Sequence, residues 1–360
     1  MSLKTANRLA RLRQTLADKE LDGIFVSQPE NRYYLSGFDG SAGFLLITPE
    51  HTILATDFRY VEQAGRQATG YEIFQIAGDA SDWFPRLVAD LNLNTLGFEA
   101  EDVTFATYRQ LTDTLKQSRL KLVATSGLVA SLRAIKEPEE IELITRAVDI
   151  ADRAFSHVRD IVHPGMREDE LAWEIEKFMR EQGSQPLPFE VIVAAGTNAA
   201  LPHAKPSPRA TASGEPVVID IGARYRGYAS DLSRTIWVGT ADDKLRKIYD
   251  TVLGAQLTAL AIIREGMTGE EADSLARTVI AETGHGDAFG HGLGHGIGLA
   301  THELPRLGPK SSDRLVDGMV FTVEPGIYLA GWGGVRIEDV AVMEAGKPRV
   351  ITRASKIYES

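Results

Sequence analysis

The sequence predicts a protein of two domains: an α/β domain over residues 1–130, and an α+β domain over residues 131–360 that contains an internal pseudo-twofold repeat. Three observations support this fold class. The chain has 360 residues, which is long for a single hydrophobic core. Strand-like and helix-like segments alternate in its first third. Two similar patterns, each a helix followed by a hairpin, succeed one another in the remainder.

The composition is ordinary for a globular protein and narrows the classes of function. Hydrophobic residues make up 43% and charged residues 25% of the chain. The formal net charge of −11 argues against nucleic acids and anionic membranes as partners. The absence of cysteine excludes disulfides, thiolate metal ligands and a cysteine nucleophile.

The sequence favours a cytoplasmic location. Its first residues contain no apolar stretch followed by a small-residue cleavage site, so we expect no secretory signal. The most apolar helical stretch, residues 252–263, is shorter than the roughly 20 residues that a membrane-spanning helix needs. The lack of cysteine fits the same location.

The first domain alternates strands and helices. Its strands are expected at residues 23–27, 43–48, 52–56, 72–76, 95–99 and 120–124. Its helices are expected near residues 57–66, 81–91 and 105–117, after an amphipathic helix at the N-terminus. The domain carries no histidine cluster, which favours a scaffold or dimerisation role. Alternatively, the segment from Asn31 to Phe38 reaches the substrate pocket of a partner subunit.

The second domain begins with a long amphipathic helix. Pro138 stands in its first turn beside Glu139 and Glu140, which is a typical helix start. We therefore place the domain boundary near residue 130.

An internal repeat organises this second domain. One helix follows Gly165-Met166 and ends before Gly183, and a helix of equal length occurs 101 residues later, ending before Gly284. Each is followed, at a similar distance, by a hairpin that carries two acidic residues. We therefore expect a pseudo-twofold domain with its active site on the axis.

The first hairpin carries Asp220 and Asp231. Both are equidistant from residues 225–226, within the polar turn 224–227, so we expect them to lie opposite each other. Directly opposed residues of an antiparallel pair point to one face about 5 Å apart. That spacing suits two carboxylates that share a metal ion.

The second hairpin has the same design. Glu324 and Glu338 are symmetric about Gly331, and both are surrounded by apolar residues. Like charges that are directly opposed destabilise a strand pair. Two such pairs therefore indicate a bound cation.

Histidines cluster between the hairpins. Half of the eight histidines, namely His285, His291, His295 and His302, fall within eighteen residues. Glycines on both sides of His295 argue against a helix and predict a close approach of backbone segments. His203 lies in a separate loop, where a solvated position and a functional one are both compatible with the local sequence. Motifs of serine hydrolases, His-Glu-x-x-His zinc enzymes, P-loops and dinucleotide-binding folds are absent.

Taken together, these residues resemble the proline-specific pita-bread metallopeptidases, which are the Xaa-Pro dipeptidases (prolidases) and the Xaa-Pro aminopeptidases. The resemblance covers essentially the whole chain. Its catalytic motifs are Asp220…Asp231, Gly294-His295-Gly-Ile-Gly, Thr322-Val-Glu324-Pro-Gly and Arg336-Ile-Glu338-Asp. The N-terminal part resembles a creatinase-type domain through Asn31–Phe38 and Thr56–Tyr60.

The resemblance implies a centre of two divalent metal ions per subunit. Asp220 would bind one metal, His295 and Glu324 the other, and Asp231 and Glu338 would bridge both. Oxygen and imidazole ligands suit Mn²⁺, Co²⁺, Zn²⁺ or Fe²⁺. Such a pair of metals holds a bridging water, lowers its pKa and polarises the scissile carbonyl.

The resemblance also implies roles for the remaining site residues. Glu324 would act as general base and then acid. His203 and His302 would contact the substrate and stabilise the tetrahedral intermediate, and His291 would line the proline pocket. Arg306 and Arg336 are candidates for binding a substrate carboxylate or for orienting a ligand acid.

The function expected is hydrolysis of the Xaa-Pro bond at the N-terminus of dipeptides or short peptides, by a cytoplasmic homodimer. Dipeptidase and aminopeptidase versions share every ligand and stay open. Two alternatives also stay open: a dinuclear hydrolase of another amide or ester, and a catalytically silent peptide-binding member of the fold.

Overall fold

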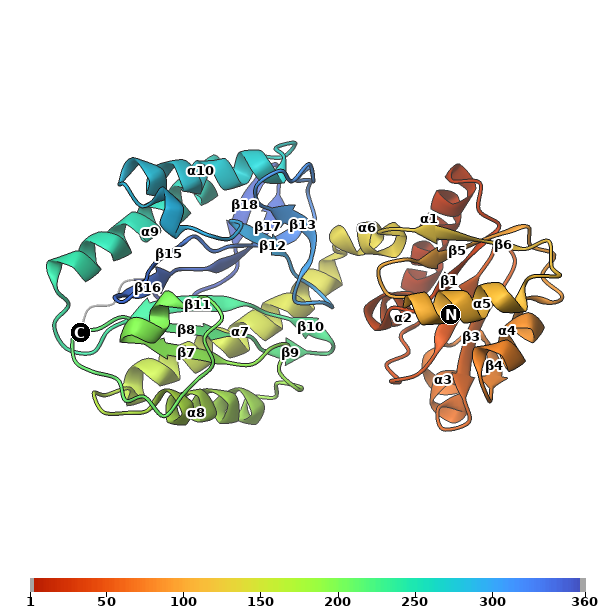
Figure 1. Ribbon diagram of the computed structural model, residues 1–360, viewed down its shortest axis with the longest axis horizontal. Coiled ribbons are helices and arrows are strands. Elements are labelled where there is room, and N and C mark those ends of the chain that lie inside the picture. The colour runs from red at the N-terminus through yellow and green to blue at the C-terminus, as the bar shows by residue number, and fades with distance from the viewer. Residues whose placement is uncertain (1–2, 357–360) are drawn as a thin grey trace. The chain divides into compact units, whose positions relative to one another are not determined.

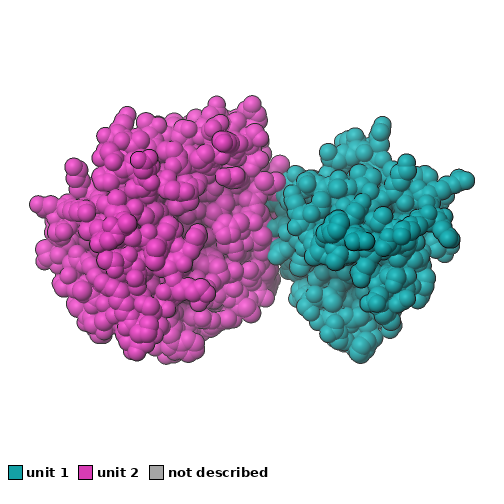
Figure 2. All heavy atoms as spheres, viewed as in Figure 1, with its two compact units in different colours: residues 1–133 teal, residues 134–360 magenta. Residues whose placement is uncertain are grey.

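The computed structural model describes residues 3–356, and the chain divides into two compact units, residues 1–133 and 134–360 (Figure 2). The sequence placed the boundary at residue 130. No helix within the described residues is long and apolar enough to cross a membrane.

Unit 1 is an α/β domain built on one mixed six-stranded sheet (Figure 1). The strand order is β4-β3-β2-β1-β5-β6. The strands are β1 (Gly23–Val26), β2 (Phe44–Ile47), β3 (Thr52–Asp57), β4 (Glu72–Ile76), β5 (Thr95–Glu99) and β6 (Lys121–Thr125). The helices are α1 (Leu3–Asp18), α2 (Pro29–Ser36), α3 (Val61–Gln67), α4 (Ala80–Val88), α5 (Phe105–Thr114) and α6 (Leu128–Ala134).

All six predicted strands of unit 1 are present, and helices α2 and α6 are additions. Trp83 and Phe84 of α4 and Leu111 of α5 pack on Phe25 and Phe98 of the sheet. Helix α2 is only eight residues long and was not predicted from the sequence. Its signals are local: Pro29 stands at the helix start, and Gly37 ends it with a left-handed φ of 76°.

Unit 2 contains two pairs of long helices. They are α7 (Pro138–Ile161) with α8 (Glu168–Glu181), and α9 (Asp243–Ile262) with α10 (Gly269–Glu282). Helices α8 and α10 both have 14 residues and start 101 positions apart, so the predicted repeat is confirmed. In Figure 1 the strands of unit 2 lie between the two helix pairs.

Two main sheets lie between these helix pairs. The first is three-stranded, in the order β11-β8-β7, and the second is five-stranded, in the order β13-β12-β14-β17-β18. Short hairpins β9–β10 and β15–β16 extend from them. The strands are β7 (Ile192–Ala195), β8 (Val217–Ile221), β9 (Arg224–Tyr225), β10 (Tyr228–Ala229), β11 (Leu232–Ile236), β12 (Gly294–Gly296), β13 (Glu303–Leu307), β14 (Val320–Val323), β15 (Gly326–Leu329), β16 (Gly333–Arg336), β17 (Asp339–Glu344) and β18 (Lys347–Val350).

Equivalent backbone hydrogen bonds are formed just before the second helix of each pair. The N–H of Gly165 bonds to Thr211 before α8, and the N–H of Gly266 bonds to Leu315 before α10. The repeat therefore extends from the helices to the segments that hold them, as a pseudo-twofold arrangement requires.

The register of the first hairpin differs from the sequence prediction. Asp220 lies opposite Ser233, not opposite Asp231. The reason is a two-residue turn in which Arg226 and Gly227 both have positive φ, 48° and 87°, as in a type I′ turn. Since the error is two positions, Asp231 stays on the same face as Asp220, as its diagonal neighbour.

The register of the second hairpin agrees with the prediction. Val323 pairs with Asp339 on one side, and Gly326 pairs with Arg336 on the other. Both stretches continue the same register, so Glu324 and Glu338 lie opposite each other, symmetric about Gly331.

Candidate metal centre

One cavity of about 710 Å³ in unit 2 collects all the residues that the sequence singled out for a site. The hairpins, the glycine-rich strand β12 and two loops each contribute to its wall. The predicted residues in that wall are His203, Asp220, Asp231, His291, His295, His302, Arg306, Glu324, Arg336 and Glu338.

The carboxylates and one imidazole converge at one end of this cavity. His295 Nε2 lies 3.3 Å from Glu324 Oε1 and 3.7 Å from Asp231 Oδ2. One ligand atom each from Asp231, His295 and Glu338 fit within 4.8 Å of one another. Asp220 lines the same wall from β8.

The electrostatics of this cluster suit the binding of a cation. Burial and then the carboxylate of Glu338 raise the pKa of Asp231 well above its usual range. Burial raises the pKa of Glu338 well above its usual range, and the nearby carboxylates of Glu324 and Asp220 raise it further. Asp220 Oδ1 and Glu338 Oε1 are buried and have no hydrogen-bond partner in the described part of the chain. Buried polar atoms are normally partnered, so these orphaned oxygens suit divalent metal ions.

His295 is oriented for metal binding by its own backbone. Its Nδ1 lies 3.1 Å from the carbonyl oxygen of Gly296, which fixes the proton on Nδ1 and turns the Nε2 lone pair toward the acids. A Cβ at Gly294 would lie 2.0 Å from the Thr322 carbonyl, and one at Gly296 would lie 2.0 Å from that of Leu304. The close backbone approach predicted around His295 is therefore confirmed.

Glu324 is held in its charged form. Burial alone would raise its pKa, but the contact with His295 lowers the pKa of Glu324 to about 2. Thr322 links the same two residues, because its hydroxyl accepts from the His295 N–H and donates to Glu324 Oε1. This role of Thr322 was not predicted from the sequence.

Arg336 is buried behind the cluster and points at Asp220. Its Nη2 donates to Asp220 Oδ2 at 2.6 Å, and its Nε donates to the Ser233 hydroxyl at 2.7 Å. Its Nη1 donates to the Tyr328 hydroxyl at 2.9 Å and to the Pro202 carbonyl at 3.2 Å. Of the site acids, its ion pair is with Asp220 and not with Glu338.

A chain of hydrogen bonds continues from Arg336 to His291. The Tyr328 hydroxyl lies 2.9 Å from His291 Nε2, and His291 Nδ1 lies 2.8 Å from the Gly292 carbonyl. Burial lowers the pKa of His291. A neutral His291 with its proton on Nδ1 satisfies both contacts, so this imidazole forms a fixed part of the cavity wall.

Two further histidines lie at the accessible part of the cavity. His203 follows the short helix η1 (Gly196–Ala200), and His302 precedes β13; both are exposed. The ring of His302 lies 4.2 Å from that of His295, between centroids. Partial burial and the neighbouring His295 lower the pKa of His302. A neutral His302 can accept or donate a hydrogen bond to a ligand.

Arg306 lies on β13, opposite His295 in the sheet register. It is exposed to the cavity, and its guanidinium has no ion-pair partner among residues 3–356. A free cation in this wall can bind a ligand carboxylate.

Two buried carboxylates that the sequence analysis missed hold the histidine loops. Glu168, which is fully buried, accepts from the Ala195 N–H, the Asn198 side chain, and the N–H and hydroxyl of Ser207. These donors flank His203. Glu303, directly after His302, is ion-paired to Lys136. Both partnerships join residues far apart in sequence, so no local pattern predicts them.

The chain matches known families over nearly its whole length. Residues 142–345 match the metallopeptidase family M24, and residues 8–135 match the creatinase/prolidase N-terminal domain. The chain belongs to metallopeptidase family M24. It is 35% identical to an Xaa-Pro dipeptidase of Pyrococcus furiosus over 353 residues, which cover 97% of this chain and 98% of that relative.

Two solved structures illustrate the likeness of this M24 chain. An Xaa-Pro dipeptidase from Bacillus anthracis has a TM-score of 0.94 and 44% identity, covering 98% of this chain and 99% of that one. An X-Pro aminopeptidase from Thermotoga maritima MSB8 has a TM-score of 0.87 and 36% identity, covering 97% of this chain and 99% of that one. The expected family and its two-domain pita-bread fold are therefore confirmed.

Proposed function

We propose that this M24 metallopeptidase is an Xaa-Pro dipeptidase, which hydrolyses the bond before a C-terminal proline. The observation that carries the proposal is that five candidate ligands line one cavity. Within residues 3–356, two of their carboxylate oxygens have no hydrogen-bond partner, and Arg306 in the same wall has no ion-pair partner. Relatives named Xaa-Pro dipeptidase support it.

We assign the metal ligands as the family resemblance suggests. Asp220 would bind one divalent metal ion, His295 and Glu324 a second, and Asp231 and Glu338 both. Carboxylate oxygens and one imidazole suit Mn²⁺, Co²⁺, Zn²⁺ or Fe²⁺. When bound, such a metal pair supplies an activated water and a Lewis acid for the scissile carbonyl.

The remaining chemistry falls to side chains of this chain. Glu324 takes the proton of the attacking water on a carboxylate oxygen and delivers it to the leaving proline nitrogen. His302 and His203 hydrogen-bond the substrate carbonyl as charge develops on its oxygen. Arg336 orients Asp220 instead of binding substrate, since the ion pair with that acid occupies its guanidinium.

The cavity also suits proline as the leaving residue. The nitrogen of an Xaa-Pro bond carries no hydrogen, so the site needs no acceptor for it. His291, with the apolar Ile192 and Leu307, offers a wall for the pyrrolidine ring. Arg306 binds the carboxylate of that proline, which favours dipeptides over longer peptides.

Two further properties belong to the proposal. We propose a homodimer, as the family resemblance implies; exposed Phe58, at 76%, lies in the creatinase-type motif Thr56–Tyr60. We also propose a cytoplasmic location, which the lack of cysteine suits. Light scattering of the purified chain and fractionation of its source cells test these two properties.

The activity is tested with chelator-stripped protein, reconstituted with Mn²⁺, Co²⁺ or Zn²⁺. Ala-Pro should be cleaved only when metal is added, and faster than Ala-Pro-Ala and Ala-Ala. Equal rates on Ala-Ala would instead indicate a hydrolase without proline preference. Metal binding without cleavage of any peptide would indicate a silent binding protein.

A further inference from the structure

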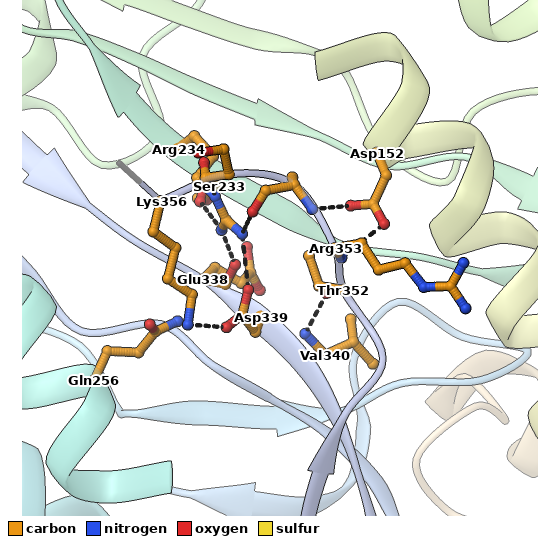
Figure 3. Close-up of polar contacts among 12 residues, drawn as sticks. Asp152, Ser233, Arg234, Gln256, Glu338, Asp339, Val340, Thr352, Arg353 and Lys356 are labelled. Atoms are coloured by element: carbon orange, nitrogen blue, oxygen red, sulfur yellow. Dashed lines mark hydrogen bonds and ion pairs between the residues drawn. The ribbon is translucent and has the colours of Figure 1, made fainter. Parts of the chain in front are cut away.

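A buried charged cluster adjoins Glu338, and its residues do not line the cavity. Figure 3 shows the polar contacts of this cluster. Arg234 and Asp339 are 1% and 0% exposed, and Arg234 Nη2 lies 2.8 Å from Asp339 Oδ1. Lys356, near the C-terminus, forms a second ion pair with Asp339. The proposed reaction uses none of these three residues.

The guanidinium of Arg234 joins the backbone of Glu338 to the C-terminal segment. Its Nη1 donates to the Glu338 carbonyl and, at 3.0 Å, to the Ser233 carbonyl. Its Nη2 donates to the Ala354 carbonyl at 2.8 Å, and its Nε donates to the Ser355 carbonyl at 3.2 Å. The Arg234 side chain thus joins the backbone of Glu338, a proposed metal ligand, to two residues of the C-terminal segment (Figure 3).

Residues 352–356, which we name the C-terminal clasp, are held by elements from both halves of unit 2. In α7, Asp152 accepts from the N–H groups of Arg353 at 2.8 Å and Ala354 at 3.0 Å. In α9, the Tyr249 hydroxyl donates to the Lys356 carbonyl. The Thr352 hydroxyl accepts from the Val340 N–H at 2.9 Å, two residues after Glu338.

Two ion pairs make the clasp and β17 depend on each other. Arg234 pairs with Asp339 Oδ1 and Lys356 pairs with Asp339 Oδ2, and the Asp339 side chain is fully buried. Removing Lys356 leaves the buried Oδ2 atom without a partner among the described residues, which disfavours the observed arrangement. Because Asp339 directly follows Glu338, any shift that restores solvation to Asp339 also moves the ligand.

We propose that the C-terminal clasp positions Glu338 for metal binding, with Arg234 and Lys356 as the positioning residues. The inference rests on the proposed function, because it takes Glu338 to be a metal ligand. Carboxylate–metal distances are confined to about 2.0–2.2 Å for a metal such as Zn²⁺. Loss of partners behind a metal ligand typically weakens metal affinity by about 10–100-fold.

A matched pair of variants tests the clasp. Lys356→Met removes a cation that contacts buried Asp339 and is only 21% exposed. Arg353→Met removes a cation of the same segment that is 77% exposed and 3.7 Å from Asp149. Co²⁺ is titrated into each chelator-stripped full-length protein by calorimetry, and the visible spectrum of bound Co²⁺ is recorded.

The clasp predicts that Lys356→Met binds at least one Co²⁺ about 10–100-fold more weakly, with an altered visible spectrum. Arg353→Met should bind Co²⁺ like the wild type, and Lys356→Arg, which keeps the cation, should recover most of the affinity. Wild-type affinity and spectrum in Lys356→Met would overturn the inference, even if its metal-free melting temperature fell.

Glu338→Gln separates failure of the clasp from failure of the proposed function. If Glu338→Gln binds two Co²⁺ ions with wild-type affinity, Glu338 is not a ligand and the metal assignment itself is wrong. If Glu338→Gln weakens binding while Lys356→Met does not, the ligand assignment stands and the clasp inference alone is overturned.

Discussion

Lys136 Nζ lies 2.8 Å from a carboxylate oxygen of Glu303, and the two side chains are 1% and 5% exposed. Lys136 precedes α7, and Glu303 follows His302 directly. A buried ion pair therefore ties the first residues of unit 2 to the loop that carries a proposed catalytic histidine.

Lys136→Met is expected to destabilise the protein by about 3–5 kcal/mol, because it removes the cation that pairs with the buried carboxylate of Glu303. Turnover should fall as well, since the adjacent His302 loses its support. Urea unfolding of metal-free protein measures the first effect. Lys205→Met is the control, because its pair with Glu190 is 81% and 66% exposed and contributes little. Equal stabilities of the two variants would contradict this account.

Glu168→Gln is expected to lower kcat/KM while metal content stays at the wild-type value. The amide would place a donor against the donors from Asn198 and Ser207. Each group left unsatisfied costs about 1–3 kcal/mol, which disturbs the loop that carries His203.

His203→Ala should lower turnover more than Glu168→Gln does, by about 10²–10³-fold, because His203 is proposed to stabilise the developing oxyanion. Steady-state kinetics and metal analysis check both; Glu174→Gln, on the exposed face of α8, should match the wild type.

Asp231→Asn is expected to abolish metal binding and activity but to stabilise the metal-free protein near neutral pH. In the folded state the pKa of Asp231 is raised, by burial and then by Glu338, above its unfolded value. Such a group favours folding below its unfolded pKa, and this contribution is lost as pH rises toward the folded pKa. In the presence of a chelator, the melting temperature of Asp231→Asn should therefore fall less steeply with rising pH than that of the wild type. Identical pH profiles would refute the assigned repulsion, and retained turnover would refute the ligand assignment.

Arg306→Met is expected to raise KM for Ala-Pro by about tenfold or more, since a charge-assisted hydrogen bond to the substrate carboxylate is lost. KM for Ala-Pro-Ala should change less, because its carboxylate lies one residue farther along. Parallel kinetics on both peptides measure the ratio. A uniform loss on both would show that Arg306 does not select for peptide length.

Local signals in the sequence specified much of this fold. The paired Gly-Met motifs located α8 and α10, and symmetry about Gly331 placed Glu324 opposite Glu338. The first hairpin was misaligned because its turn residues, Arg226 and Gly227, lie at one end of the polar segment taken as the turn. The candidate ligands were found because each lies in a short motif with a distinct composition.

Long-range partners could not be predicted in the same way. Arg336 and Asp220 are 116 residues apart, and Arg234 and Asp339 are 105 apart. Such pairs depend on how the two halves of unit 2 pack, and neither helical nor strand periodicity encodes that choice. Arg336 was a candidate from its motif, but its pairing with Asp220 and the role of Arg234 emerged only from the structure.

The most direct test of the proposed centre is anomalous diffraction from crystals of the protein loaded with Mn²⁺. The account predicts two anomalous peaks per chain, about 3.5–4 Å apart, bounded by Asp220, Asp231, His295, Glu324 and Glu338. Peaks elsewhere, or a single fully occupied peak that does not touch both Asp231 and Glu338, would contradict it.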